Sequence, residues 1–153
     1  MNKFDFLVNF DPSLLMSAKK PKAKYDIVML IDDNDIDNFI NERMISGCNF
    51  SETTYINTGT RSALEFLRNL SVNKALRKDH LPSIIFLDIN MPILDGFQFI
   101  EEFEKLDPAI VSEIKIVMLT SSINPSDIER SKKFPSVKGF IHKPLTEENL
   151  EKC

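Results

Sequence analysis

Residues 84–96 read IIFLDINMPILDG, and this stretch decides the fold. It opens with a continuous apolar run over 84–87, which is short enough for a β-strand buried on both faces of a sheet. Asp88 follows the run directly, and the Met91-Pro92 and Asp95-Gly96 pairs are typical of a loop that leads into a helix. The stretch therefore predicts a buried strand that ends at a carboxylate.

Similar apolar runs occur before and after this stretch. Residues 27–31 and 116–119 predict two more strands buried on both faces, and 53–56 and 139–141 predict two weaker strands. Between the strands, apolar residues at helical spacing predict three helices, each with one apolar face. These faces consist of Ile36, Phe39, Ile40 and Met44; of Ala63, Leu67 and Leu70; and of Phe99 or Ile100, Phe103 and Leu106.

Two further helices complete the alternation. A mostly polar segment over 126–134 predicts a poorly amphipathic helix. Thr146 is a suitable N-cap for a last helix, which is short or truncated because the sequence stops at Cys153. Five strands alternating with five helices predict an α/β fold in which helices cover both faces of a parallel sheet.

The length and composition are those of one ordinary soluble domain, because 153 residues are too few for two substantial cores. A net charge of −4 argues against a dedicated nucleic-acid binder, and no apolar run approaches the roughly 20 residues of a membrane span. Cys48 and Cys153 have no spacing typical of a disulfide framework or a metal site, and the N-terminus has no secretory signal pattern. We therefore expect a cytoplasmic protein with neither nucleic acid nor membrane among its partners.

Residues 1–24 differ from the patterned part of the chain. Apolar residues are scattered over 1–16, and a short basic stretch with a proline follows over 19–24. We interpret 1–24 as an N-terminal extension and linker, with one short helix after Asp11-Pro12. Its aromatic residues motivate the hypothesis that it docks on its own domain, on a second copy or on a partner. A frayed, solubilising tail is the alternative.

Polar residues follow four of the predicted strands. In an open parallel sheet, ligands bind outside the carboxyl ends of the strands, where these residues would meet. Carboxylates that lie close together repel one another, and a hard divalent cation with oxygen ligands, such as Mg2+, removes this conflict. The pattern therefore predicts a Mg2+ site beside a carboxylate able to accept a phosphoryl group. The residues are Asp32 and Asp33, Asp88, Thr120 and Ser121, and Lys143 and Pro144.

A calcium loop of the EF-hand type is an alternative for the first acidic segment, because Asp33, Asp35 and Asp37 have the spacing of three of its ligands. However, Asn38 occupies the place of the required glycine, and Met44 that of the bidentate glutamate. The segment also carries the helical apolar face described above. The calcium interpretation therefore fails.

The sequence resembles the receiver domain of bacterial two-component response regulators over about 26–150. The resemblance is carried by 30–34 (LIDDN), 85–96 (IFLDINMPILDG), 119–121 (LTS) and 140–144 (FIHKP). The Asp-x-x-Met-Pro-x-x-Asp-Gly pattern is specific, and the acidic pair upstream with Thr and Lys-Pro downstream makes it more so. The resemblance implies a receiver domain over 25–153 with a flavodoxin-like, doubly wound (βα)5 fold and a parallel sheet of order 2-1-3-4-5.

The resemblance also implies a role for each acidic residue. Asp88 corresponds to the phosphoacceptor. Asp33 corresponds to the direct carboxylate ligand of Mg2+, and Asp88 and the backbone carbonyl of Asn90 complete the protein ligands. Asp32 is expected to act on the ion through water.

The downstream motifs correspond to the residues that respond to phosphorylation. Thr120 would hydrogen-bond a phosphoryl oxygen, and Lys143 would supply the positive charge paired with the phosphoryl group. Phe140 corresponds to the aromatic switch residue, with core packing as the alternative. The Lys143–Pro144 bond is expected to be cis.

The implied function is that of a stand-alone response regulator in phosphorelay signal transduction. It would accept a phosphoryl group from a sensor histidine kinase or a histidine phosphotransfer protein, and catalyse only its own phosphorylation and dephosphorylation. The surface of the first helix, around Ile36, Asn38, Phe39 and Met44, would select that donor. The face formed by the helix over 126–134, the strand over 139–141 and the last helix would bind a downstream protein or a second copy.

Two other functions are weighed against this one. A receiver fold that serves as a constitutive interaction module usually lacks one of the acidic residues, the Thr or the Lys, and this sequence keeps them all. A phosphatase with an aspartyl-phosphate intermediate needs a second aspartate two residues after the nucleophile. Asn90 stands there instead.

Overall fold

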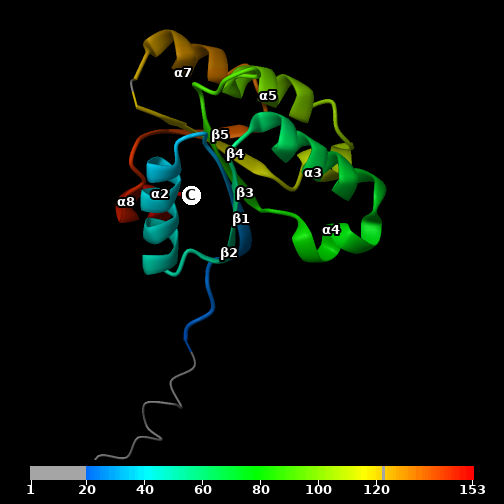
Figure 1. Cartoon of the computed structure of the whole chain (residues 1–153), viewed down its shortest axis with the longest axis horizontal. Helices are drawn as coiled ribbons and strands as arrows, with labels where there is room; N and C mark the ends of the chain where they lie inside the picture. The colour runs from blue at the N-terminus through cyan, green and yellow to red at the C-terminus, as the bar shows by residue number, and fades with distance from the viewer. Residues whose placement is uncertain (1–19, 122) are drawn as a thin grey trace, which may run out of the picture.

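A five-stranded parallel sheet forms the centre of the computed structural model, which describes residues 20–121 and 123–153 (Figure 1). The strands lie in the order β2-β1-β3-β4-β5, which confirms the predicted fold class and strand order. Each of the five predicted apolar runs falls within one of these strands. The strands are β1 (Tyr25–Ile31), β2 (Ser51–Asn57), β3 (Ile84–Asp88), β4 (Lys115–Thr120) and β5 (Val137–His142).

Helices cover both faces of the sheet. α2 and α8 lie on one face, and α3, α5 and α7 lie on the other (Figure 1). This is the doubly wound arrangement that alternating strands and helices predict. The helices of the described residues are α2 (Asp35–Gly47), α3 (Thr60–Val72), α4 (Lys74–His80), α5 (Gly96–Phe103), α6 (Pro108–Val111), α7 (Pro125–Ser131) and α8 (Glu147–Glu151).

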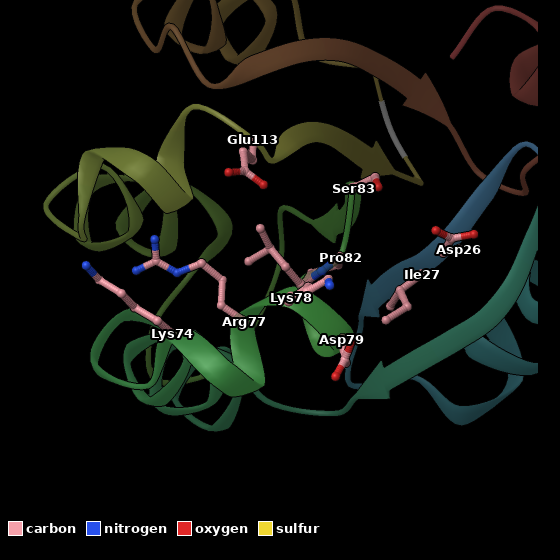
Figure 2. A pocket seen from close by; sticks show the side chains of 10 residues that line it. Asp26, Ile27, Lys74, Arg77, Lys78, Asp79, Pro82, Ser83 and Glu113 are labelled. Carbon is pink, nitrogen blue, oxygen red and sulfur yellow. The ribbon is translucent and has the colours of Figure 1, made fainter.

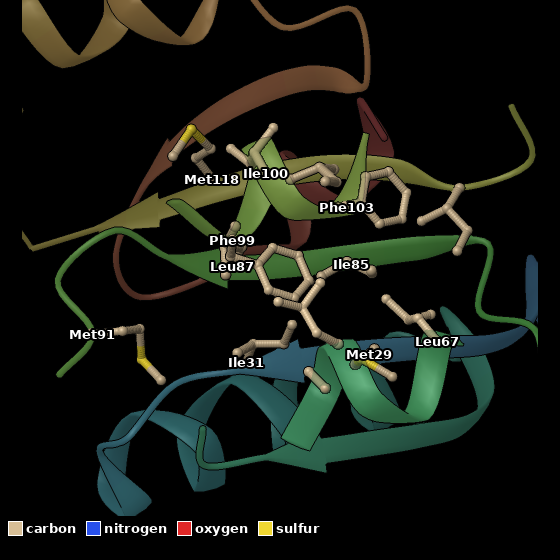
Figure 3. Close-up of a cluster of buried hydrophobic side chains, with 14 of the residues drawn as sticks. Met29, Ile31, Leu67, Ile85, Leu87, Met91, Phe99, Ile100, Phe103 and Met118 are labelled. Atoms are coloured by element: carbon tan, nitrogen blue, oxygen red, sulfur yellow. The ribbon is translucent and has the colours of Figure 1, made fainter. Parts of the chain in front are cut away.

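Two hydrophobic clusters pack between the sheet and its helices, and β3 contributes to both. Successive side chains of a strand point to opposite faces. Accordingly, Ile85 and Leu87 belong to the cluster that includes α3 and α5, whereas Ile84 and Phe86 belong to the cluster that includes α2 and α8. Figure 3 shows the first cluster between the sheet and the two helices. β3 is buried along its whole length, including its terminal aspartate, as the apolar run predicts.

The apolar face of α2 is not the face that this helix buries. Ile36, Phe39 and Ile40 are exposed, with 70%, 59% and 41% of their surface accessible. Polar side chains can face the protein interior here because they hydrogen-bond to backbone groups of neighbouring loops, which the helical periodicity of apolar residues does not reveal. The residues that the helix buries are Asn38, Asn41 and Ile45.

Two short helices depart from the predicted alternation. α4 follows α3 after Asn73, whose side chain accepts a hydrogen bond from the backbone N–H of Leu76. α6 begins after Asp107, which caps it in the same way, and its first residue is a proline. The predicted helix over 126–134 ends earlier, at Ser131, and α8 is short as expected.

The residues directly before β1 already contact the domain. Ala23 is buried, and its backbone N–H donates to Oε1 of Glu52 at 2.9 Å. The carbonyl oxygen of Pro21 accepts a hydrogen bond from Asn49 at 2.8 Å. The helix and the docking segment predicted for the first part of the extension lie outside the described residues. Within the part of the chain that the structure describes, no helix is long and apolar enough to cross a membrane.

Candidate functional site

Three aspartates meet at the carboxyl ends of β1 and β3. Ile31 on β1 pairs with Leu87 on β3, so the residues that follow them, Asp32 and Asp88, are neighbours at the edge of the sheet. Together with Asp33, they place one carboxylate oxygen each within 4.8 Å of the others. Asp32 and Asp88 are buried and Asp33 is exposed, so the group opens to solvent on one side. The structure thus brings together the three acidic residues that the sequence singled out.

Lys143, which directly follows β5, places its ammonium group among these carboxylates. Its Nζ lies 2.5 Å from Oδ2 of Asp32 and 3.5 Å from Oδ1 of Asp88. A third carboxylate, that of Asp37 on α2, lies 3.0 Å away. Only 10% of the lysine side chain is exposed. The positive charge is therefore held inside the site, and two of its partners, Asp32 and Asp37, lie more than 100 residues away in the sequence.

The charges of Asp88 and Lys143 are shifted by this environment. Burial raises the pKa of the Asp88 carboxyl and the charge of Asp32 adds to the rise, whereas Lys143 opposes it without cancelling it. Burial lowers the pKa of Lys143, but hydrogen bonds to Asp32 and Asp37 outweigh this effect, and the pKa is raised overall. Lys143 therefore stays positively charged, and it lies beside the Asp88 carboxylate, whose negative charge it offsets only in part.

Thr120 lies next to Lys143 at the end of the neighbouring strand. It is the last residue of β4, it is buried, and its carbonyl oxygen accepts a hydrogen bond from the backbone N–H of Lys143 at 2.7 Å. The Lys143–Pro144 peptide bond is cis, as the resemblance implies. One residue further on, the backbone N–H of Leu145 donates to Oδ1 of Asn41 on α2 at 2.9 Å. The segment that carries the lysine is therefore tied to both β4 and α2.

Two further residues that the sequence singled out, Asn90 and Phe140, lie outside the group of three carboxylates. Asn90 is exposed on the loop after β3, and its backbone N–H donates to Oδ1 of Asp88 at 3.3 Å. Its carbonyl as a metal ligand stays a prediction. Phe140 lies in β5 and is half-buried against the cluster of α3 and α5. Its inward movement on activation likewise stays a prediction.

The loop between β3 and α5 is shaped by backbone contacts. The N–H of Gly96 donates to the carbonyl oxygen of Ile89 at 2.9 Å, which folds the loop back on the end of β3. Asp95 caps α5 in a capping box with Gln98. Ile93 has a φ of 70° and is 79% exposed, a backbone conformation that a β-branched residue rarely adopts. The loop is thus held in a strained form directly beside Asp88.

Asp37 is a site residue that the sequence did not identify. The pattern of the sequence indicates this aspartate only as a ligand of the rejected calcium loop, whereas its contact with Lys143 joins α2 to a residue 106 positions later. Only its place in the first turn of a helix that follows the acidic pair could have drawn attention to it.

A different cleft opens at the opposite end of the sheet, where the strands begin. Figure 2 shows its lining, which mixes basic residues of α4 with acidic residues such as Asp26 and Glu113. Arg77, its most buried cation, is already paired with Asp107 at 2.7 Å. Among the described residues, the only group of acidic, histidine or cysteine side chains close enough to hold a metal is the one at the carboxyl ends. We therefore assign the functional site to that end.

The strand order and the layers place the protein in the flavodoxin-like class of α/β folds, with an acidic site at the carboxyl ends of its strands. Within that class, the chain belongs to the response regulator receiver domain family, whose sequence profile matches residues 28–153. Proteins of this family are phosphoacceptors in two-component signalling. A search of curated proteins gave no match.

Solved structures agree with this assignment. A two-component response regulator from Cytophaga hutchinsonii is 31% identical, with a TM-score of 0.75 over 83% of this chain and 92% of that protein. A response regulator receiver protein from Dyadobacter fermentans is 24% identical, with a TM-score of 0.71 and coverages of 82% and 92%. A chemotaxis response regulator of Vibrio cholerae is 21% identical, with a TM-score of 0.62 and coverages of 84% and 94%. The last two similarities concern the fold.

Proposed function

We propose that this receiver domain accepts a phosphoryl group on Asp88 from a histidine kinase or a histidine phosphotransfer protein. One observation carries the proposal: the buried carboxylate of Asp88 lies within 3.5 Å of the Lys143 ammonium and beside two further carboxylates. A carboxylate with an incompletely offset charge is a suitable nucleophile, and an adjacent cation can offset the charge of an incoming phosphoryl group. The domain would catalyse only its own phosphorylation and dephosphorylation.

The group of three carboxylates fits a Mg2+ ion. Mg2+ prefers oxygen ligands, and it binds through one or two carboxylates together with waters and phosphate oxygens. We propose that Asp33, Asp88 and the carbonyl of Asn90 hold the ion directly and that Asp32 holds it through water. When bound, the ion would neutralise the carboxylates and the oxygens of the phosphoryl group.

Asp88, Lys143 and Thr120 have separate roles in the transfer. An oxygen of the Asp88 carboxylate forms the new bond to phosphorus, and the bond from phosphorus to the donor's imidazole nitrogen breaks with its electron pair on that nitrogen. Lys143 offsets the charge on the oxygens of the phosphoryl group, and the hydroxyl of Thr120 donates a hydrogen bond to one of them. Water later attacks the phosphorus, and the bond from phosphorus to the Asp88 oxygen breaks with its electron pair on that oxygen, which releases phosphate and regenerates the carboxylate. Catalysis is mainly positioning and electrostatics.

A conformational change at β5 and the neighbouring helices would make phosphorylation detectable to a partner. Phosphorylation adds a charge of about −1.5 to −2 beside Thr120 and Lys143, which favours a conformation in which the threonine approaches the phosphoryl group. We propose that Phe140 then moves inward and alters the face of α7, β5 and α8. This face would bind the downstream protein or a second copy of the chain. Phosphorylation can shift the equilibrium only as far as it distinguishes the two conformations.

Intact mass spectrometry after incubation with acetyl phosphate and Mg2+ tests the proposal. We expect the mass of one phosphoryl group to be added, and we expect no adduct to form when EDTA is present throughout the incubation. No adduct, together with no change in the NMR spectrum on addition of beryllofluoride, would contradict the proposal. That result would favour a constitutive interaction module.

The exposed apolar residues of α2 predict where the phosphodonor docks. Ile36 and Phe39 are 70% and 59% exposed beside the site, and large exposed apolar residues that lie together often mark an interface. We expect Phe39→Ala to slow transfer from a phosphorylated histidine phosphotransfer protein on the order of tenfold, because buried aromatic residues often dominate interfaces. The rate with acetyl phosphate should remain unchanged.

Val72→Ala on α3 is the control, because Val72 is also apolar and 84% exposed but lies at the far end of a different helix. Stopped reactions resolved by mass give both rates. If Phe39→Ala slows acetyl phosphate and the protein donor equally, then the residue supports the site itself and the docking surface lies elsewhere.

A further inference from the structure

Asp37 contacts the site without belonging to its group of carboxylates. It lies in the first turn of α2, with 34% of its side chain exposed, and its Oδ2 accepts a hydrogen bond from Nζ of Lys143 at 3.0 Å. The carboxylates close enough to share a cation are those of Asp32, Asp33 and Asp88, and Asp37 is not among them. Asp37 therefore interacts with the lysine from outside the candidate metal group.

α2 holds the lysine segment at two successive turns. Asp37 and Asn41 are four residues apart and so lie on the same face of the helix. Asp37 contacts Lys143, and Asn41 accepts a hydrogen bond from the backbone N–H of Leu145, two residues further along. The neighbouring Asn38 donates from Nδ2 to the carbonyl oxygen of Asp32 at 2.7 Å. This face of α2 thus fixes both the acidic strand end and the lysine that faces it.

The ammonium group and a bound cation compete for the same oxygens. The ammonium group of Lys143 donates hydrogen bonds to Asp32 and Asp37 and forms an ion pair with Asp88 at 3.5 Å. Two of these three carboxylates also belong to the candidate metal group. When a divalent cation binds there, the lysine must give up part of its interaction with them. Asp37 is then the carboxylate that still offers it a partner.

We propose that Asp37 is a positioning residue that draws the Lys143 ammonium partly away from Asp32 and Asp88 and leaves these two carboxylates available to the metal. The inference rests on the proposed function, because it assumes a divalent cation in the acidic group. Without the Asp37 carboxylate, Lys143 pairs more closely with Asp32 and Asp88. Metal binding then has to displace a stronger ion pair, and its affinity falls.

The test compares Asp37→Asn and Asp37→Glu with Asp35→Asn. Asp35 lies in the same first turn of α2 and has the same charge, but the ion pairs of Lys143 are with other residues. Mn2+ serves as the probe, and its dissociation constant is measured by electron paramagnetic resonance. The Lys143 ammonium signal is followed by 15N NMR in the metal-free protein, after assignment with Lys143→Arg. Neither measurement needs phosphoryl transfer.

We expect Asp37→Asn to weaken Mn2+ binding about tenfold, the scale of one hydrogen bond to a charged group, and to shift the Lys143 ammonium signal. Asp37→Glu should restore both, and Asp35→Asn should change the affinity less than twofold, as expected for a solvent-screened charge. Equal effects of Asp37→Asn and Asp35→Asn would overturn the inference in favour of simple charge. An unchanged ammonium signal, or no Mn2+ binding by the wild type, would also overturn it. If these responses appear but acetyl phosphate gives no adduct, then the proposed function fails and the role of Asp37 stands.

Discussion

Asp88→Asn is expected to abolish the phosphoryl adduct completely. The amide nitrogen and oxygen of asparagine are poor nucleophiles. In the proposed mechanism, the neighbouring Asp32 and Asp33 hold the metal and do not accept the phosphoryl group. The matched control is Asp35→Asn, an exposed aspartate outside the site, which should keep the adduct. Intact mass after incubation with acetyl phosphate and Mg2+ distinguishes the two. An adduct of wild-type yield on Asp88→Asn would show that another residue is the acceptor, and peptide mapping would identify it.

The same substitution should stabilise the metal-free protein at neutral pH. Burial raises the pKa of Asp88 above its usual value, so the folded state disfavours the charged form. This penalty is absent when the carboxyl is neutral at acid pH, and it appears as the pH rises through the raised pKa. The asparagine carries no charge at any pH. We therefore expect Asp88→Asn to exceed the wild type in free energy of unfolding at pH 7 and the difference to shrink towards pH 4, as measured by urea denaturation. A lower stability at pH 7 would contradict this.

The fold could be predicted because its strands have a local signature. The runs over 84–87 and 116–119 are apolar at every residue, as a strand covered on both faces requires, and the structure buries both runs completely. The parallel arrangement then follows from the alternation with helices. The strand order needed the family resemblance, because no local pattern in the chain says which strand lies beside which.

The buried face of α2 could not be predicted, for a reason that lies far away in the sequence. Asn41 is buried, and its Oδ1 accepts a hydrogen bond from the backbone N–H of Leu145, which lies 104 positions later in the sequence. Apolar periodicity assumes that only apolar side chains turn inward. It therefore cannot show that the helix presents Ile36, Phe39 and Ile40 to solvent and turns two asparagines inward.

The three aspartates and the lysine that meet at the site were predictable, but Asp37 and the contacts of the lysine were not. Residues at the carboxyl ends of parallel strands must meet at one edge, and Asp32, Asp88 and Lys143 do so. The sequence does not show how a long, flexible lysine side chain chooses among nearby carboxylates. Its contact with Asp37 depends on where α2 lies over the sheet, which only the folded structure defines.

Gly96→Ala is expected to damage both the stability and the phosphorylation of the domain. A Cβ atom at Gly96 would lie 2.7 Å from the carbonyl oxygen of Asp88 and 2.9 Å from Cα of Ile89, and both are backbone atoms that cannot rotate away. The backbone after β3 must move, at a cost of about 1–3 kcal/mol or more in the free energy of unfolding. Because a displacement of about 1 Å can slow a reaction on the order of 10²-fold, the rate of phosphorylation should fall far more than the stability alone explains.

Gly47→Ala supplies the matched control for this prediction. Gly47 ends α2 with a negative φ, and a Cβ atom there meets nothing within 4 Å. The same change should therefore stabilise the protein by about 0.5–1 kcal/mol, because alanine loses less conformational freedom in a helix than glycine does. Urea denaturation and the acetyl phosphate rate, measured on both variants under conditions where each is fully folded, separate the two effects. If the folded Gly96→Ala protein is phosphorylated at the wild-type rate, then the close contact between α5 and the end of β3 serves stability alone and does not position the acceptor carboxylate.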